Sequence, residues 1–245
     1  MNRLRVVTYN VHKCRGMDGR VSAARIAGVL HEVNADIVAL QEITVPQADA
    51  ISHELGMPYT IGENRRHRGF AYGNVLLSRW PIGETRNYDL SVRGREERGC
   101  LRADVAVSNG PLLHVFNVHL GTSLLERREQ GRRLIAPELL AHRDLHAPRI
   151  VLGDFNEWTT GLATRLLRSH LQSADVRAHL RKSRTYPGLL PFLHLDHIYY
   201  DPALRLEKLR LHRTRKALIS SDHLPLVGDF AWDPAAANGA TAPPA

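Results

Sequence analysis

The chain has 245 residues, of which 43% are hydrophobic and 24% charged, so it can build a packed core and is not a disordered protein. Its formal net charge is +8, and four of its 33 cationic residues are lysines, which makes the chain rich in arginine. This balance permits nucleic acid, anionic lipid head groups or small phosphoesters as partners and does not choose among them, and genome base composition can produce the same bias. Two cysteines, Cys14 and Cys100, are too few for a disulfide framework.

We expect one domain at residues 1–231 and a disordered tail at residues 232–245. The tail reads WDPAAANGATAPPA and is poor in large apolar residues. No stretch approaches the roughly 18 uninterrupted apolar residues of a spanning helix, and the first residues contain no long apolar signal segment. These features predict a soluble, cytoplasmic protein without a transmembrane segment, and we expect a monomer.

Strands and helices alternate in the first part of the chain. An apolar strand ends at Asn10, and Ser22 is suited to cap a helix whose apolar residues recur at helical spacing. A second strand ends in the polar pair Gln41-Glu42. The expected elements are strand 3–9, a helix after Ser22, strand 37–40 and helix 46–55.

The middle of the chain predicts short strands joined by turns. The pair Asn109-Gly110 between two of them is typical of a hairpin, so these strands should pair in antiparallel fashion. The expected strands are 59–61, 70–77, 82–90, 101–107 and 112–119.

An amphipathic helix is predicted for residues 124–145, which Pro137 must kink or divide. A central strand, a helix near 159–170 and the strands 198–200, 206–211 and 226–230 follow. Strand-rich halves flanked by helices indicate two mixed sheets packed together with helices outside.

The central stretch Arg149–Asn156 ends an apolar strand in Asp154 and Asn156. Alternation along an extended chain would place both side chains on one side, where they could converge on a reacting centre. The alternative is that they form an Asx turn that caps the following helix. This motif alone does not decide between the two interpretations.

Polar groups recur at the ends of other strands, and this repetition favours a catalytic site. Carboxylates, amides and imidazoles at strand ends from all parts of a chain are how a sheet-based enzyme assembles its site. The strand-end residues are Asn10, Glu42, His119, Asp154 with Asn156, and Asp196, and the loop 220–225 adds Asp222 and His223.

Seven short motifs in a fixed order resemble the endonuclease/exonuclease/phosphatase superfamily, which includes deoxyribonuclease I, exonuclease III and the inositol polyphosphate and sphingomyelin phosphodiesterases. The segment 184–187 is similar to one found in short bacterial members. The resemblance implies an α/β (α+β) fold, a four-layer sandwich in which two mixed, mostly antiparallel sheets pack face to face with helices outside. The motifs are 8–10, 40–42, 73–79, 117–120, 153–156, 195–198 and 221–225.

The resemblance also implies a divalent-metal-dependent phosphoesterase. Glu42 resembles the principal metal carboxylate, with Asn10 and Asp222 as further ligands or water-mediated partners. Oxygen ligands without cysteines suit Mg²⁺ or Mn²⁺, and either one or two ions fit the pattern.

The other matched positions imply catalytic roles. Asp154 resembles the residue that activates or aligns the attacking water, and Asn156 the one that holds this water or a phosphate oxygen. Asp196 resembles the acid that pairs with His223 and favours its protonated form. His119 should face the same phosphate from the other side.

Several polar residues are interpreted as structural instead. His12, His194 and His197 are expected to be satisfied structural histidines, and Asn74 is expected to hold a turn. Arg98, Arg127 and Arg128 are left out of the site, because charged residues on a helix usually form a solvated face.

The sequence leaves the substrate open. The chain is compact, without a long insertion carrying an aromatic and basic wedge, and its aromatic content is 6%, which argues against a duplex-distorting repair nuclease. The expected reaction is hydrolysis of a phosphodiester in nucleic acid or in a small or lipid molecule. The alternatives are a phospholipid or small-molecule phosphatase without nuclease activity and a catalytically inactive binding module. The apolar loop 187–195 fits a lipid but also fits a loop that covers the core.

Overall fold

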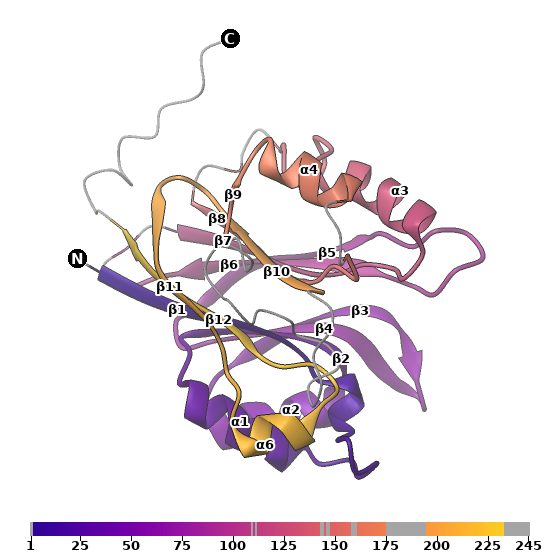
Figure 1. The fold of residues 1–245 in the computed structure, drawn as a ribbon, viewed down its shortest axis with the longest axis vertical. Helices are drawn as coiled ribbons and strands as arrows, with labels where there is room; N and C mark the ends of the chain where they lie inside the picture. Colours follow the sequence, from indigo (N-terminus) through magenta and orange to yellow (C-terminus); the bar gives the residue numbers. More distant parts are fainter. Residues whose placement is uncertain are drawn as a thin grey trace.

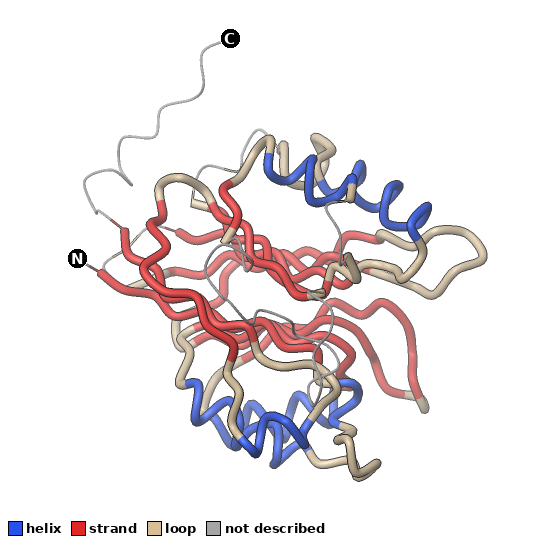
Figure 2. The backbone as a smooth tube through the Cα atoms, viewed as in Figure 1, coloured by secondary structure: helices blue, strands red, loops and turns tan. Residues whose placement is uncertain are grey.

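The computed structural model describes residues 2–108, 110, 112–142, 145, 148–157, 161–174 and 195–232. Two six-stranded sheets lie face to face, and helices cover the outer face of each (Figure 1). The layers follow the order helix, sheet, sheet, helix (Figure 2). This is the predicted four-layer α/β sandwich.

The first sheet has the strand order β11-β12-β1-β2-β4-β3. Only β1 and β2 pair in parallel, and the other neighbours are antiparallel. Its strands are β1 (Asn2–Asn10), β2 (Ile37–Thr44), β3 (Tyr59–His67), β4 (Phe70–Ser78), β11 (Leu204–Leu211) and β12 (Leu226–Trp232).

The second sheet has the order β5-β6-β7-β8-β10-β9, and here β7 and β8 form the parallel pair. The hairpin predicted around Gly110 joins β6 to β7 in antiparallel register. The strands are β5 (Ile82–Asp89), β6 (Gly99–Ala106), β7 (Leu112–His119), β8 (Arg149–Asp154), β9 (Gln172–Ser173) and β10 (Asp196–Tyr200).

Alternation along each strand divides the apolar residues between the layers. Val6 of β1 belongs to the core between the sheets, whereas its neighbour Val7 packs toward α1 and α2 on the outer face. On the second sheet Phe116 and Val151 pack toward α3 and α4. The helices are α1 (Ala23–Val33), α2 (Val45–Leu55), α3 (Leu124–Leu134), α4 (Leu162–Arg168) and α6 (Arg215–Ser220).

Three expectations about helices need correction. The predicted helix 124–145 ends at Leu134, three residues before Pro137, rather than continuing through a kink. The helix expected near 159–170 covers Leu162–Arg168. Neither α6 nor the 3-10 helix His12–Cys14 was predicted.

The expected boundary of the carboxyl-terminal tail falls inside a strand. Trp232, placed in the tail, belongs to β12 and is 5% exposed within the core between the sheets. The rest of the tail, residues 233–245, lies outside the described residues, as do the segments 184–187 and 187–194.

Buried amides join the two sheets beneath the strand ends. Gln41 Nε2 donates to Asn117 Oδ1 at 2.7 Å, and Asn117 Nδ2 donates to the carbonyl oxygens of Leu40 and Val75 at 2.9 and 2.8 Å. Asn74 Nδ2 donates hydrogen bonds to the carbonyl oxygens of Gly99 and Asn117. Asn74 therefore lies within β4 and cross-links sheets, rather than holding a turn as predicted. Hydrogen bonds between buried groups of the two sheets fix the relative position of the layers.

Candidate active site

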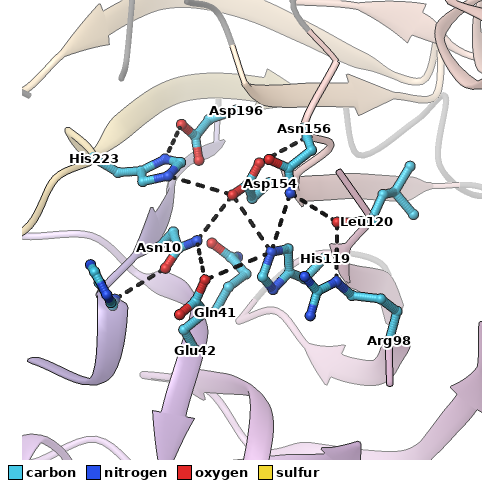
Figure 3. Close-up of polar contacts among 12 residues, drawn as sticks. Asn10, Gln41, Glu42, Arg98, His119, Leu120, Asp154, Asn156, Asp196 and His223 are labelled. Atoms are coloured by element: carbon cyan, nitrogen blue, oxygen red, sulfur yellow. Dashed lines mark hydrogen bonds and ion pairs between the residues drawn. The ribbon is translucent and has the colours of Figure 1, made fainter. Parts of the chain in front are cut away.

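The polar strand ends identified in the sequence meet at one end of the two sheets (Figure 3). The first sheet contributes Asn10 at the end of β1 and Glu42 in β2. The second contributes His119 at the end of β7 and Asp154 at the end of β8. Both parallel strand pairs point their carboxyl ends at this site, which is where ligands bind in open α/β sheets.

Asp154 is the centre of the cluster and is 1% exposed. Its Oδ2 accepts a hydrogen bond from Asn10 Nδ2 at 3.0 Å. The same oxygen lies 3.7 Å from His119 Nε2 and 3.6 Å from His223 Nε2. One carboxylate oxygen thus faces two imidazole rings that come from different sheets.

His223 is paired with Asp196 as the resemblance implied. Its Nδ1 lies 3.0 Å from Asp196 Oδ2, and Asp196 pairs with Asp154 across β10 and β8. Burial disfavours the charged ring, but the carboxylates of Asp196 and Asp154 outweigh burial and raise the pKa of His223 to about 10. His223 is therefore an imidazolium at neutral pH.

His119 has the opposite protonation state. Burial and the nearby guanidinium of Arg98 lower the pKa of His119 to about 4, although Asp154 and Glu42 act in the other direction. Arg98 is buried beside it and donates through Nε to the carbonyl oxygen of Leu120 at 3.2 Å. At neutral pH the site therefore contains one neutral and one protonated histidine on either side of Asp154.

Glu42 occupies a bulge in β2. The pairing of β2 with β4 shifts register between Leu40 and Ile43, and Glu42 has a φ of 58°. A left-handed conformation is costly for a residue other than glycine and is characteristic of functional sites. The bulge turns Glu42 toward the cluster while Gln41 points into the amide contacts between the sheets.

The Glu42 carboxylate receives hydrogen bonds from three side chains. Asn10 Nδ2 donates to Oε1 at 3.3 Å, while Lys13 Nζ and Tyr72 Oη donate to Oε2 at 3.2 and 3.1 Å. Burial alone would raise the pKa of Glu42, but His119, when protonated, and Lys13 lower it. The net effect holds the pKa of Glu42 well below its usual range, so we expect its carboxylate to be ionised at neutral pH.

Asn10 and Asp222, the other two predicted metal ligands, each have a side-chain oxygen in contact with His12. Asn10 Oδ1 accepts the backbone N–H of His12 at 3.1 Å, so its amide nitrogen faces the carboxylates. Asp222 Oδ2 lies 3.2 Å from His12 Nδ1. Burial opposes protonation of His12, but its hydrogen bond to Asp222 prevails and raises its pKa. The ring of His12 has a hydrogen-bond partner, as expected of a satisfied histidine, and this partner is the predicted site residue Asp222.

Asn156 does not reach the site by strand alternation. It follows the end of β8 and has a φ of 50°. Its backbone N–H donates to Asp154 Oδ1 at 2.9 Å, and its Nδ2 donates to the carbonyl oxygen of Leu120 at 2.9 Å. An Asx turn, the alternative derived from the sequence, thus brings Asn156 to within 3.4 Å of His119 Nε2.

Gly153 is required immediately before Asp154. Its φ is 149°, and a Cβ at this position would lie 1.9 Å from the carbonyl oxygen of Val118. This close approach of β8 to β7 is open only to glycine. The glycine therefore sets the position from which Asp154 projects.

The arginines that were left out of the site divide into two kinds. Arg128 is exposed, as expected for a solvated helix face. Arg127 is 5% exposed and donates through Nη1 to the carbonyl oxygens of Gly121 and Thr122, so the solvated-face interpretation is wrong for it. His197 contacts the carbonyl oxygen of Glu157 at 3.0 Å, which agrees with a structural role. His194 lies outside the described residues.

The side chains predicted to hold a cation have oxygen ligands of the kind that suits a hard divalent ion. Glu42 and Asp222 carry carboxylates and Asn10 a carboxamide, the ligand types that Mg²⁺ and Mn²⁺ prefer. In the part of the chain that is described, no group of three or more His, Cys, Asp or Glu side chains is arranged to hold an ion by itself. A cation here would depend on one or two carboxylates with an amide, water and substrate oxygens, which is the usual manner of Mg²⁺ binding.

The two six-stranded sheets with helices outside form a deoxyribonuclease I-like fold. The chain belongs to the endonuclease/exonuclease/phosphatase family, whose model matches residues 7–223. Members of this family are generally hydrolases that act on phosphoester bonds and typically use divalent metals. Escherichia coli YbhP, an uncharacterized protein, is 31% identical over 245 residues that cover 92% of this chain and 95% of YbhP.

Two solved structures illustrate the similarity of fold. The mannosyl-6-phosphatase of Bacteroides thetaiotaomicron has a TM-score of 0.76 and 19% identity, covering 94% of this chain and 100% of its own. D. rerio TDP2 in complex with a single-strand DNA product has a TM-score of 0.74 and 17% identity, covering 94% and 100%. Within the described residues, no helix combines the length and apolar character needed to cross a membrane.

Proposed function

We propose that this protein is a divalent-metal-dependent phosphoesterase that hydrolyses a phosphodiester by in-line attack of an activated water. The observation that carries the proposal is the pair of histidines facing Asp154 Oδ2, whose pKa values lie on opposite sides of neutrality. Titratable groups whose environments separate their pKa values mark acid and base functions. A buried carboxylate between a neutral and a charged imidazole is suited to proton transfer at a phosphate.

In this proposal Asp154 aligns or activates the attacking water, and Asn156 holds the water or a phosphate oxygen. The imidazolium of His223, kept protonated by Asp196, stabilises negative charge on the phosphate oxygens. His119 faces the phosphate from the second sheet. Its low pKa allows it to offer a neutral ring, which hydrogen-bonds a phosphate oxygen without forming an ion pair with Asp154.

Glu42 would hold the cation, with Asn10 and Asp222 as ligands or water-mediated partners. When bound, Mg²⁺ or Mn²⁺ supplies positive charge that neutralises the phosphate oxygens. The Asn10 amide would need to turn its oxygen toward the ion, because its nitrogen faces Glu42 and Asp154 in this structure. The proposal includes either one ion or two. It also keeps the expectation from the sequence that the protein is a cytoplasmic monomer.

A substrate panel tests the activity. Plasmid DNA, RNA, an abasic duplex, phospholipids and bis-p-nitrophenyl phosphate are each incubated with Mg²⁺ and with Mn²⁺. We expect hydrolysis of at least one phosphodiester, loss of that activity in EDTA, and recovery when either metal is added in excess. Full turnover in EDTA would refute the dependence on a metal ion. Absence of turnover on every substrate would refute the proposed activity.

Two alternatives differ in what they hydrolyse. A phospholipid or small-molecule phosphatase without nuclease activity uses the same cluster, and solved structures of similar fold include both a sugar phosphatase and TDP2 with bound single-strand DNA product. Fold similarity therefore supplies no substrate. A catalytically inactive binding module is less well supported, because Glu42, Asp154 and His223 are all present and face one another.

A further inference from the structure

The exposed apolar side chains of this protein are concentrated around the candidate active site. Among the described residues, the large hydrophobic side chains that are exposed are Met17, Val21, Phe70, Leu112, Leu124, Leu125 and Ile219. All except Leu112, which begins β7 at the opposite end, lie on segments that leave or enter the site end of the sheets. We call this set without Leu112 the apolar rim.

The first sheet supplies four members of the apolar rim. Met17 and Val21 belong to the loop after β1, and the backbone N–H of Met17 donates to the carbonyl oxygen of Ile219 at 3.1 Å. Phe70 is 52% exposed at the tip of the β3–β4 hairpin, which projects at the right of Figure 1. Val21 and Phe70 line one cavity of about 460 Å³ together with Lys13, whose Nζ lies 3.2 Å from Glu42.

The second sheet supplies the other two members. Leu124 and Leu125 begin α3, shortly after His119 ends β7, and they are 56% and 71% exposed. The apolar rim therefore lies on both sides of the cluster around Asp154. Exposed apolar side chains that gather on one surface mark a contact with a partner or a membrane, whereas scattered ones need no explanation.

Arginines alternate with the apolar rim. Arg15, Arg68 and Arg128 lie on the same loops and helix start as members of the rim. Arg93 and Arg95 lie on the loop between β5 and β6, which joins β6 where Gly99 pairs with His119 at the site end. All five are exposed, and none has an ion pair with another described residue. Of the acidic residues nearby, Asp18 pairs with Arg25 and Glu96 pairs with Arg65 and Arg98, while Glu97 stays exposed. The surface around the site thus combines positive charge with aliphatic side chains.

We propose that the apolar rim and its arginines dock this protein on the surface of an anionic phospholipid bilayer, with the active site facing the head groups. Aliphatic side chains enter the boundary between head groups and acyl chains, and cations bind the anionic surface. A single-stranded nucleic acid would instead require aromatic platforms, and Phe70 is the one aromatic member of the rim. The docking surface is inferred from the positions of the exposed side chains alone. The further inference that a lipid phosphodiester is the substrate rests on the proposed function as well.

The test measures binding separately from catalysis. The full chain is sedimented in EDTA with vesicles of phosphatidylcholine alone or mixed with phosphatidylglycerol. We expect binding to the anionic vesicles and little to the neutral ones. Replacing Leu124 and Leu125 together with Ser should weaken this binding by about tenfold, since two exposed leucines lose their apolar insertion. Leu112→Ser, at 51% exposure on the opposite end, is the matched control and should bind like the wild type.

A second pair of variants tests the charge. Arg68→Glu with Arg93→Glu should weaken binding to anionic vesicles severalfold, whereas Arg3→Glu, an exposed arginine at the opposite end, should not. Absence of vesicle binding, or equal losses in rim and control variants, would overturn the proposal. Binding to a single-stranded oligonucleotide that is lost in the arginine variants, without vesicle binding, would assign the rim to nucleic acid instead.

Turnover of bis-p-nitrophenyl phosphate with Mg²⁺ separates this inference from the proposed function. The rim variants should retain hydrolysis of this soluble substrate and lose hydrolysis of vesicle phospholipid. A wild type that binds vesicles but hydrolyses nothing would refute the enzyme activity while leaving the docking surface intact.

Discussion

Replacing Asp196 with Asn tests the electrostatic arrangement of the site most directly. Asp196 is fully buried, and its Oδ2 lies 3.0 Å from His223 Nδ1. The rise of the His223 pKa from 6.5 to about 10 corresponds to roughly 5 kcal/mol in favour of the protonated ring, at about 1.4 kcal/mol per tenfold change. Asp196 and Asp154 are the main sources of this preference. Asp196→Asn should therefore lower the His223 pKa, because the negative charge nearest the ring is lost.

In the proposed function, His223 acts in its protonated form, and this determines the direction in which activity changes with pH. A group with a raised pKa keeps its function below that pKa and loses it as the pH rises through it. The wild type should therefore lose activity near pH 10, and the variant should lose it at a lower pH. A bound cation would lower both values, so the comparison should also be made in EDTA by following the His223 ring in NMR titrations.

The double variant supplies the decisive result. His223→Ala should remove most turnover, and adding Asp196→Asn should cost little more, because residues that act as a unit are not additive. Independent, additive losses would refute the pairing and would assign Asp196 to metal or water instead. An unchanged His223 titration in Asp196→Asn would refute the electrostatic reasoning even if activity fell.

Three further predictions follow from the geometry. Glu42→Gln keeps the side-chain volume but removes the ligand charge, so the metal concentration needed for half-maximal turnover should rise at least tenfold; a wild-type metal titration would make another carboxylate the primary ligand. Asn117→Ala should lower the free energy of unfolding by about 2–4 kcal/mol in a denaturant titration, because it leaves buried partners such as Gln41 unsatisfied. Asn87→Ala removes an exposed hydrogen bond between the sheets, to the carbonyl oxygen of Glu63, and should cost less; equal losses would count against the importance of burial for the amides between the sheets. An abasic duplex should be cut no faster than an intact one, and a large preference for the lesion would overturn the argument from the compact chain.

The amino-acid sequence predicted the strands and their layers well because alternation and turn residues act locally. The residue Ser22 caps α1 as expected, with its side chain accepting a hydrogen bond from the Arg25 N–H. The predictions failed where the chain departs from periodicity. The helix α3 ends at Leu134, before the chain reaches Pro137. The helix α6 is too short for apolar residues to recur at a recognisable helical spacing.

The members of the candidate site could be selected from strand ends and family motifs, and the structure brings all eight of them together. Their individual geometry was less accessible. Strand alternation predicted that Asn156 lies near Asp154 at the site, which is where it lies. The reason was different, because an Asx turn and not an extended strand places Asn156 there. The contact of His12 with Asp222 was not predicted, because it joins opposite ends of the chain and no local pattern reports such a distance. Arg127 was misjudged because burial of one face of α3 depends on tertiary packing.

The protonation states depend on the same long-range packing, and this is why the two sheets matter to the chemistry. His119 and His223 have the same side chain and face the same oxygen of Asp154, yet their pKa values move in opposite directions. His119 lies beside Arg98 of the second sheet, whereas His223 lies against Asp196, which β10 places directly opposite Asp154. Sliding one sheet against the other by a few ångströms would weaken the effect of Asp196 on His223, because these residues come from different sheets and charge interactions within a buried site change steeply with distance. The amides Gln41, Asn117 and Asn74 hold the sheets in register beneath the site, so loss of these amides should narrow the separation between the two histidine pKa values as well as reduce stability.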